Sequence, residues 1–304
     1  MIEFQIILFI YMLAGIIAKK AKLVSEKGAS DIAALMINII LPCMVLGAFT
    51  SKMSSSMWTE LGAALLCAVF GQAVCIAFAF VLYKKVPEYR RGVIRYGTMT
   101  SNYSFLGMPS CQVAYGAEGI LLASVTQIIY RITTWTIGVP TVAGPAARKK
   151  GSAVKLFFHP CMVALFIGVI YMLLPFEAPS FLISAIKGIG NCSTPFCMIY
   201  VGFVMADIKW NKEVIRPLVL YSLLRLIIMP AVVFAGLYLF HVEPVIIGVT
   251  VLQTAMPAPS TSAVFAGQYG KDSRFAGQMV FVTTALSLVT TPLVVSVMNS
   301  ILGL

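Results

Sequence analysis

Charged residues are scarce in this chain. Of its 304 residues, 11% are Asp, Glu, Lys or Arg and 60% are hydrophobic, whereas a soluble globular domain carries about 25% charged residues. A soluble fold of this length has too much surface to cover with so few charges. The composition therefore excludes a soluble protein and predicts a polytopic membrane protein.

The sequence also lacks the motifs of common enzymes and metal sites. Its seven cysteines form no Cys-x-x-Cys pair, and neither of its two histidines has a metal-ligand neighbour. There is no phosphate-binding glycine loop, no zinc-protease motif and no catalytic pair within the apolar runs. We therefore expect no enzyme activity, no ATP hydrolysis, no metal and no cofactor, apart from a coupling ion such as Na+ or H+.

Apolar runs predict an all-α fold of ten membrane-spanning helices, since about 20 apolar residues cross a bilayer. In the first half of the chain, the runs cover residues 4–18, 31–50, 57–83, 93–115 and 118–144. In the second half, they cover residues 157–174, 179–206, 214–240, 244–268 and 276–302. No basic segment precedes the first run and no cleavage site follows it, so we interpret that run as a retained helix.

Lysine and arginine residues alternate between the predicted loops. Eighteen of the 22 basic residues follow an odd-numbered helix: Lys19, Lys20, Lys22, Lys27, Lys84, Lys85, Arg90, Arg91, Arg95, Arg148, Lys149, Lys150, Lys155, Lys209, Lys212, Arg216, Lys271 and Arg274. Because basic loops stay in the cytoplasm, we expect both termini on the outer side of the cell membrane. The net charge of +11 then sets orientation and does not indicate a nucleic-acid partner.

Short motifs recur with an offset of five helices. An Asn-x-x-x-Pro motif lies at 38–42 in the second helix and at 191–195 in the seventh. A Met-Pro pair lies at 108–109 in the fourth and at 256–257 in the ninth. An odd number of helices in each unit makes the second unit insert upside down. The sequence therefore predicts an inverted repeat of five plus five helices, as in many transporters.

Prolines interrupt the fourth and ninth helices where the sequence is unusually polar. Pro109 lies 14 residues beyond Arg95, and Pro257 lies 14 residues beyond Glu243. A proline removes a backbone hydrogen bond, and broken helices persist in membranes only where they line protein or a cavity. A simple kink is the alternative, but two symmetric breaks favour a crossover near the bilayer centre, with Gly107 and Pro259 as further irregular positions.

Positive charge is predicted inside the membrane without a negative partner. Three basic residues, Arg131, Lys187 and Arg225, fall within apolar runs, whereas all eleven acidic residues fall in loops or at helix ends. Arg131 is the deepest, and we interpret it as an anion-binding or gating residue, the alternative being a bond to backbone carbonyls. Lys187 and Arg225 lie within about two turns of a helix end, and we expect both to snorkel.

The predicted binding site surrounds the two breaks. Half-helix N-termini at such breaks present unpaired N–H groups, which prefer an anion. Ser101, Asn102, Gln253 and Arg131 are the candidate ligands on this basis. Asn38 and Asn191 either form the facing wall of the site or pack between helices through hydrogen bonds.

At this point the crossover motifs resemble a known family. The segment Asn102-Tyr-Ser-Phe-Leu-Gly-Met-Pro109, followed by a Tyr-Gly pair, is similar to the auxin efflux carrier family, which includes PIN-like transporters and bacterial relatives. Met256-Pro257 running on to Tyr269 is similar too. The resemblance covers the whole chain, without the long cytoplasmic loop of plant auxin exporters. That family shares its architecture with the bile acid–sodium symporters.

The resemblance implies two domains and a mechanism. Residues 1–55 and 148–208 would form a scaffold domain, and residues 56–147 and 209–304 a transport domain that moves like an elevator. It also implies a homodimer through the scaffold, crossover prolines at Pro109 and Pro257, and contact between Asn102 and a substrate carboxylate.

The predicted function is that of a secondary transporter. We expect it to move a small organic anion, a mono- or dicarboxylate such as malate or malonate, across the cell membrane. The alternatives are a sodium-coupled symporter of the bile-acid type and a membrane sensor that binds a carboxylate without transporting it. The specific acid, the direction of transport and the coupling ion are not encoded in any motif.

Overall fold

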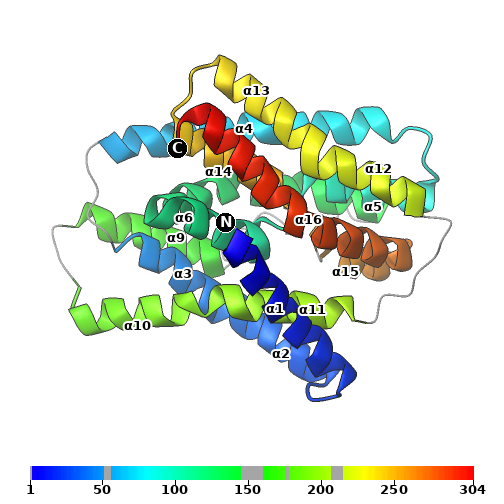
Figure 1. Ribbon diagram of the computed structural model, residues 1–304, viewed down its shortest axis with the longest axis horizontal. Coiled ribbons are helices and arrows are strands. Elements are labelled where there is room, and N and C mark those ends of the chain that lie inside the picture. The colour runs from blue at the N-terminus through cyan, green and yellow to red at the C-terminus, as the bar shows by residue number, and fades with distance from the viewer. Residues whose placement is uncertain (1, 51–55, 145–159, 175–177, 207–214, 260) are drawn as a thin grey trace.

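The computed structural model is all-helical, as the apolar runs predict (Figure 1). The structure describes residues 2–50, 56–144, 160–174, 178–206, 215–259 and 261–304. Several basic residues used for the orientation lie outside these ranges: Arg148, Lys149, Lys150, Lys155, Lys209 and Lys212. Within the described ranges, no residue belongs to a β-strand.

In the first half of the chain, three short π-helices lie between α-helices. Their bounds are α1 (Ile2–Lys20), α2 (Glu26–Leu35), η1 (Met36–Ile40), α3 (Leu41–Ala48), α4 (Ser56–Leu82), α5 (Glu88–Met99), η2 (Tyr103–Gly107), α6 (Met108–Thr133), η3 (Thr134–Gly138) and α7 (Val139–Ala143).

The second half follows a similar order. Its elements are α9 (Pro160–Leu173), α10 (Ser180–Asn191), α11 (Ser193–Met205), α12 (Ile215–Leu223), η6 (Leu224–Ile228), α13 (Met229–Leu239), α14 (Pro244–Thr254), α15 (Thr261–Gln268) and α16 (Ser273–Leu302). In both halves a long helix precedes a broken one, and another long helix follows it.

Five described helical stretches are long and apolar enough to cross a membrane: Glu26–Gly47, Thr59–Leu82, Glu88–Ala143, Pro217–Leu239 and Ser273–Leu302. The third of these contains a reversal of the chain at Gly116, whose backbone has φ 63° and ψ −144°. A Cβ added to Gly119 would collide with the carbonyl of Cys111. In a straight helix these two residues would be about 12 Å apart, so the chain folds back here, close to the predicted boundary between the fourth and fifth helices.

The second and fourth predicted helices begin earlier than the apolar runs predict, because their first turns are polar. The second predicted helix starts at Glu26, five residues before residue 31, and the Ser25 side chain accepts a hydrogen bond from the Gly28 N–H at 3.0 Å. The fourth starts at Glu88, directly after Pro87. Polar side chains at a helix start can accept hydrogen bonds from its free N–H groups. Because such a turn is not apolar, it lies outside the runs from which the helices were predicted.

Each described π-helix ends two residues before a proline. The prolines concerned are Pro42, Pro109, Pro140 and Pro230, which follow η1, η2, η3 and η6. A proline has no N–H to donate, and its ring clashes with the carbonyl one turn earlier. A wider π-turn relieves that clash, so the chain continues as a helix through all four positions.

The helices pack as two groups (Figure 1). The first helix group contains α1, α2, η1, α3, α9, α10 and α11, in which α1 packs on α11 and α3 packs on both α9 and α10. The second helix group contains α4 to α7 and α12 to α16 with η2, η3 and η6, and α4, α6 and α14 form its centre. Contacts of α3 with α6 and of α11 with η2 join the groups.

Two glycines allow the closest helix crossing in the first group. A Cβ on Gly15 of α1 would collide with the Ile199 carbonyl of α11, and a Cβ on Gly202 would collide with the Met12 carbonyl. Small residues let membrane helices approach backbone to backbone, which increases their van der Waals contact. The crossing therefore depends on the absence of a side chain at both positions.

We predict that Gly202→Ala forces α1 away from α11 and lowers the free energy of unfolding by about 1–3 kcal/mol, as overpacking does elsewhere. The measurement is the melting temperature of the detergent-purified protein. Gly188→Ala is the matched control, since a Cβ at Gly188 in the same group meets nothing within 4 Å. Equal melting temperatures for the two variants would contradict the prediction.

Candidate functional site

The two broken helices meet at their breaks. Helix α5 ends at Met99, and residues 100–102 are non-helical before η2 begins. Helix α14 ends at Thr254 and is followed by non-helical residues 255–259. The N–H of Asn102 donates to the carbonyl of Pro257 at 2.8 Å. This bond satisfies one backbone group from each break, as a low-dielectric interior demands.

The first break lies before Pro109, not at it. Pro109 is a buried residue at the start of α6, and η2 lies between it and the non-helical segment. The π-turn accommodates its missing N–H, so this proline widens the helix without ending it. Gly107, also buried, faces Met256 and Gln253 across the crossing. Pro257, in contrast, lies within the second break.

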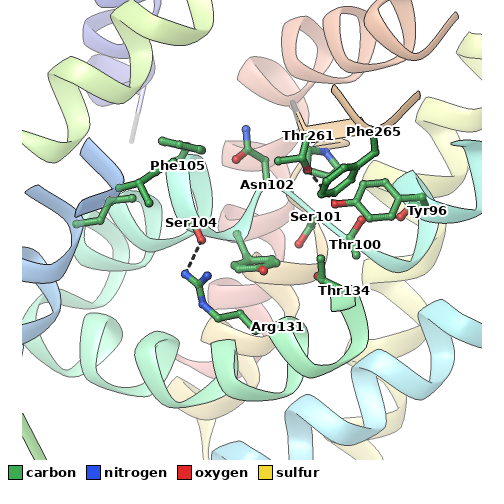
Figure 2. A pocket seen from close by; sticks show the side chains of 14 residues that line it. Tyr96, Thr100, Ser101, Asn102, Ser104, Phe105, Arg131, Thr134, Thr261 and Phe265 are labelled. Carbon is green, nitrogen blue, oxygen red and sulfur yellow. Dashed lines mark hydrogen bonds between the residues drawn. The ribbon is translucent and has the colours of Figure 1, made fainter. Parts of the chain in front are cut away.

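A cavity of about 140 Å³ lies beside the two breaks (Figure 2). Four of the predicted site residues line it: Ser101, Asn102, Arg131 and Pro259. The second helix group contributes most of the remaining wall, and Ile37 and Leu41 of the first group complete it. The site is thus built between the two groups. Among the described residues that line it, none is acidic.

Two helix starts face this cavity. Tyr103, Ser104 and Phe105, the first residues of η2, line it, and so does Thr261, the first residue of α15. The first N–H groups of a helix have no partner within it, and the aligned peptide dipoles add a partial positive charge there. Backbone and side chain therefore both favour an anion in this space.

Arg131 of α6 supplies a full positive charge to the same space. Its Nη2 donates to the Gln127 amide oxygen at 3.2 Å and to the Ser104 hydroxyl at 3.4 Å, the second of which Figure 2 shows. Its guanidinium lies 5.8 Å from the ring centre of Tyr103. The side chain is 5% exposed, and its Nε has no partner among the described residues. A buried cation with spare donors is suited to hold an incoming carboxylate.

An aromatic wall closes the opposite side of the cavity (Figure 2). The hydroxyls of Tyr96 and Thr261 are hydrogen-bonded at 2.8 Å, and the rings of Tyr96 and Phe265 meet edge to face with centroids 5.5 Å apart. These contacts join the two broken helices a second time. Tyr96, Thr134 and Phe265 were absent from the predicted site, although Tyr96 and Phe265 each lie within about two turns of a break.

Gln253 lies behind the breaks and not in the cavity lining. It is fully buried, and its amide nitrogen donates to the Ala123 carbonyl at 3.3 Å and to the Thr126 hydroxyl at 3.4 Å. Its amide oxygen has no partner among the described residues. Gln253 therefore joins α14 to α6, and it can affect the cavity only through the position of the second break.

The structure does not bring Asn38 or Asn191 to this cavity. Asn38 is exposed and donates to the Ala34 carbonyl of its own helix at 2.8 Å. Asn191 is also exposed and lines a separate cavity. The neighbours Ile37 and Leu41 face the site in place of Asn38, because a helix turns about 100° per residue and carries adjacent side chains to different faces.

The prediction that Arg225 snorkels is wrong. Its side chain is 1% exposed, and its Nε and Nη1 have no partner among the described residues. Cys75, Tyr83 and Tyr221 are close enough to interact with it. Because η6 packs against α16 as well as its neighbours in the chain, Arg225 is enclosed within the second helix group. Lys187, by contrast, is exposed.

Comparison with known proteins decides the family. The profile described as "Membrane transport protein" matches residues 1–153 and 149–295, which together span most of the chain. The chain belongs to this membrane transport protein family. This is the auxin efflux carrier family that the crossover motifs resemble. It is a multi-pass membrane transporter and not an enzyme.

Relatives of this transporter come from archaea and bacteria. It is 23% identical over 288 residues to an uncharacterized transporter of Methanothermobacter thermautotrophicus, covering 93% of this chain and 94% of that protein. It is 22% identical over 291 residues to one of Methanocaldococcus jannaschii, with the same coverage. A Rhizobium meliloti protein named "Putative malonate transporter" is 26% identical over 147 residues, which are 48% of this chain and 46% of that protein.

We predict that Arg225→Met leaves the melting temperature of the purified transporter unchanged or raises it. Arg225 has spare buried donors and no acidic partner among the described residues, and replacing buried ions by apolar residues is often neutral or stabilising by about 1–4 kcal/mol. Tyr221→Phe, which removes a neighbouring unpaired hydroxyl, should behave in the same way. A clear fall for Arg225→Met would instead show that a ligand or water chain holds this charge.

Proposed function

We propose that this transporter is a secondary transporter of small organic carboxylates and that the cavity beside the two breaks is its substrate site. One observation carries the proposal: two helix starts and the Arg131 guanidinium converge on a cavity whose described lining contains no acidic residue. An anion in this space would meet only positive or neutral groups. The name of the Rhizobium meliloti relative supports malonate as the first acid to test.

The size of the cavity favours a small acid. Its volume of about 140 Å³ lies well below the ~300–1,000 Å³ typical of sites for drug-sized ligands. A mono- or dicarboxylate of a few carbons matches such a space better than a steroid acid. We therefore place this transporter nearer to the carboxylate carriers than to symporters of the bile-acid type.

The proposed mechanism is an elevator in which the second helix group moves against the first. The ten predicted spans would form two inverted units, with α5–η2 and α14–α15 as the crossing helices. Ser101, Asn102 and Arg131 all belong to the second group, whereas Ile37 and Leu41 of the first group only cover the cavity. A substrate held by the second group could thus travel with it past the first group.

The orientation and the assembly belong to the same proposal. The basic residues that follow the odd-numbered predicted helices support both termini on the outer side of the membrane, under the positive-inside rule. A homodimer through the first helix group is what the resemblance to the auxin efflux carriers implies.

We predict that Arg131→Gln lowers the uptake of radiolabelled malonate into proteoliposomes at least tenfold. A hydrogen bond to a charged group is worth ~1.5–3 kcal/mol, which corresponds to an affinity change of roughly 10- to 100-fold. Arg131→Lys should keep part of the uptake, because it preserves the charge. Lys20→Gln is the control for a charge lost outside the cavity. Wild-type uptake by Arg131→Gln would rule out this site.

A thermal-stability screen of the purified transporter identifies the ligand class. We predict that malonate or another short carboxylate raises the melting temperature, because a ligand that binds only the folded state stabilises it. The screen is repeated with Na+ replaced by choline, and a Na+-dependent shift would assign sodium coupling. Stabilisation without any uptake or counterflow would favour a sensor, and the absence of a shift with every carboxylate would contradict the proposal.

A further inference from the structure

A second cavity, of about 300 Å³, also lies between the two helix groups. The first group contributes part of α3 and α10 to its lining, including Gly47, Lys187 and Asn191. The second group contributes α6 residues around the Gly116 reversal, including Gln112. Among the described residues that line it, Lys187 is the one charged group and none is acidic.

The two cavities follow one another along the contact between the groups. On the first group, Ile37 and Leu41 line the substrate cavity, and Cys43, Met44 and Gly47 line the second one, further along the same helix. Ser104 and Gln112, which line the substrate and second cavities, are eight residues apart, or roughly 12 Å along a helix. Because α2 begins next to the basic residues Lys22 and Lys27, the second cavity is on the side away from them.

Glycines place Lys187 in this cavity. A Cβ on Gly190 would meet the Met44 backbone at 2.8 Å, so α10 lies directly on α3. One turn before Gly190, the stem of Lys187 lies over Gly47, where a Cβ would be 3.5 Å from its Cγ. Lys187 therefore lines the cavity with its stem on α3, and its side chain is exposed.

We propose that the second cavity is an outer binding site for the same carboxylate, in which Lys187 attracts the anion and the amides of Gln112 and Asn191 donate hydrogen bonds to it. The inference rests on the proposed function for the identity of the anion. Glu118 follows the lining residue Ala117 but is not itself part of the lining, so Lys187 is the one charged group that an anion meets on the described wall of the cavity. Since both helix groups form its walls, the cavity must change shape when one group moves against the other, as an outer vestibule would.

The test compares the two faces of the membrane in oriented vesicles. Lys187→Gln should raise the KM for malonate on the outer face at least fivefold at low ionic strength, with little change in maximal rate and no change for malonate on the inner face. Lys187→Arg should restore the outer KM. Raising the ionic strength should reduce the difference in outer KM between the wild type and Lys187→Gln, because salt screens exposed charges. Lys20→Gln, on the basic side, is the matched control. An unchanged outer KM, or an equal change on both faces, would overturn the proposal.

A binding measurement separates this inference from the proposed function. Arg131→Gln weakens malonate binding in the substrate cavity, so the tighter of the binding events that remain, measured by isothermal titration, should come from the second cavity. This tighter event should be lost in the double variant Arg131→Gln with Lys187→Gln. Its persistence in the double variant, or its absence from Arg131→Gln, overturns the outer site. A wild-type protein that transports no carboxylate would overturn the proposed function, whatever these titrations show.

Discussion

The hydrogen bond from the Asn102 N–H to the Pro257 carbonyl fixes the geometry on which the site depends. Each broken helix leaves backbone groups unpaired in the interior of a membrane protein, where an unsatisfied group costs several kcal/mol. Pairing one break with the other satisfies a group from each at a distance of 2.8 Å. The same pairing directs the starts of η2 and α15 toward one cavity. The polar site is thus a consequence of how the breaks are stabilised.

Two buried arginines show how the surroundings of a charge decide its role. Arg131 and Arg225 are 5% and 1% exposed, and both have guanidinium atoms without a partner among the described residues. Arg131 lines a cavity and is held by Gln127 and Ser104, so an anion can reach it. Arg225 is enclosed by aromatic and thiol groups of the second helix group. Its charge therefore adds a positive potential to the interior of that group, which makes an anion bound nearby more favourable and a cation less so.

The sequence predicted the elements better than it predicted the side chains that face the site. The all-helical fold was predicted from hydropathy, and five described helical stretches are long and apolar enough to cross a membrane. Ser101 and Asn102, polar residues near the predicted breaks, line a cavity. The helix starts at Glu26 and Glu88 were missed, because the first turns of both helices are polar and lie outside the apolar runs. Asn38, for which a place on the wall of the site and a packing role both stayed open, points away from the cavity that its neighbour Ile37 lines, because a helix turns adjacent side chains to different faces. Aromatic residues such as Tyr96 could not be separated from ordinary core residues, because both contribute buried apolar surface.

The closest contacts of the glycines distinguish the inside of each helix group from the boundary between the groups. Every described glycine whose Cβ would meet another part of the chain within 4 Å meets its own group: Gly15 and Gly202 join α1 to α11, and Gly92 joins α5 to α7. Where two helices lie too close for a methyl group between them, their backbones hold each other in one relative position. Between the groups, side chains make the contact instead, as in the ring pair of Phe105 in η2 and Tyr200 in α11, whose centroids are 6.1 Å apart. The closest backbone approaches therefore lie inside each helix group, and side chains form the boundary that contains both cavities.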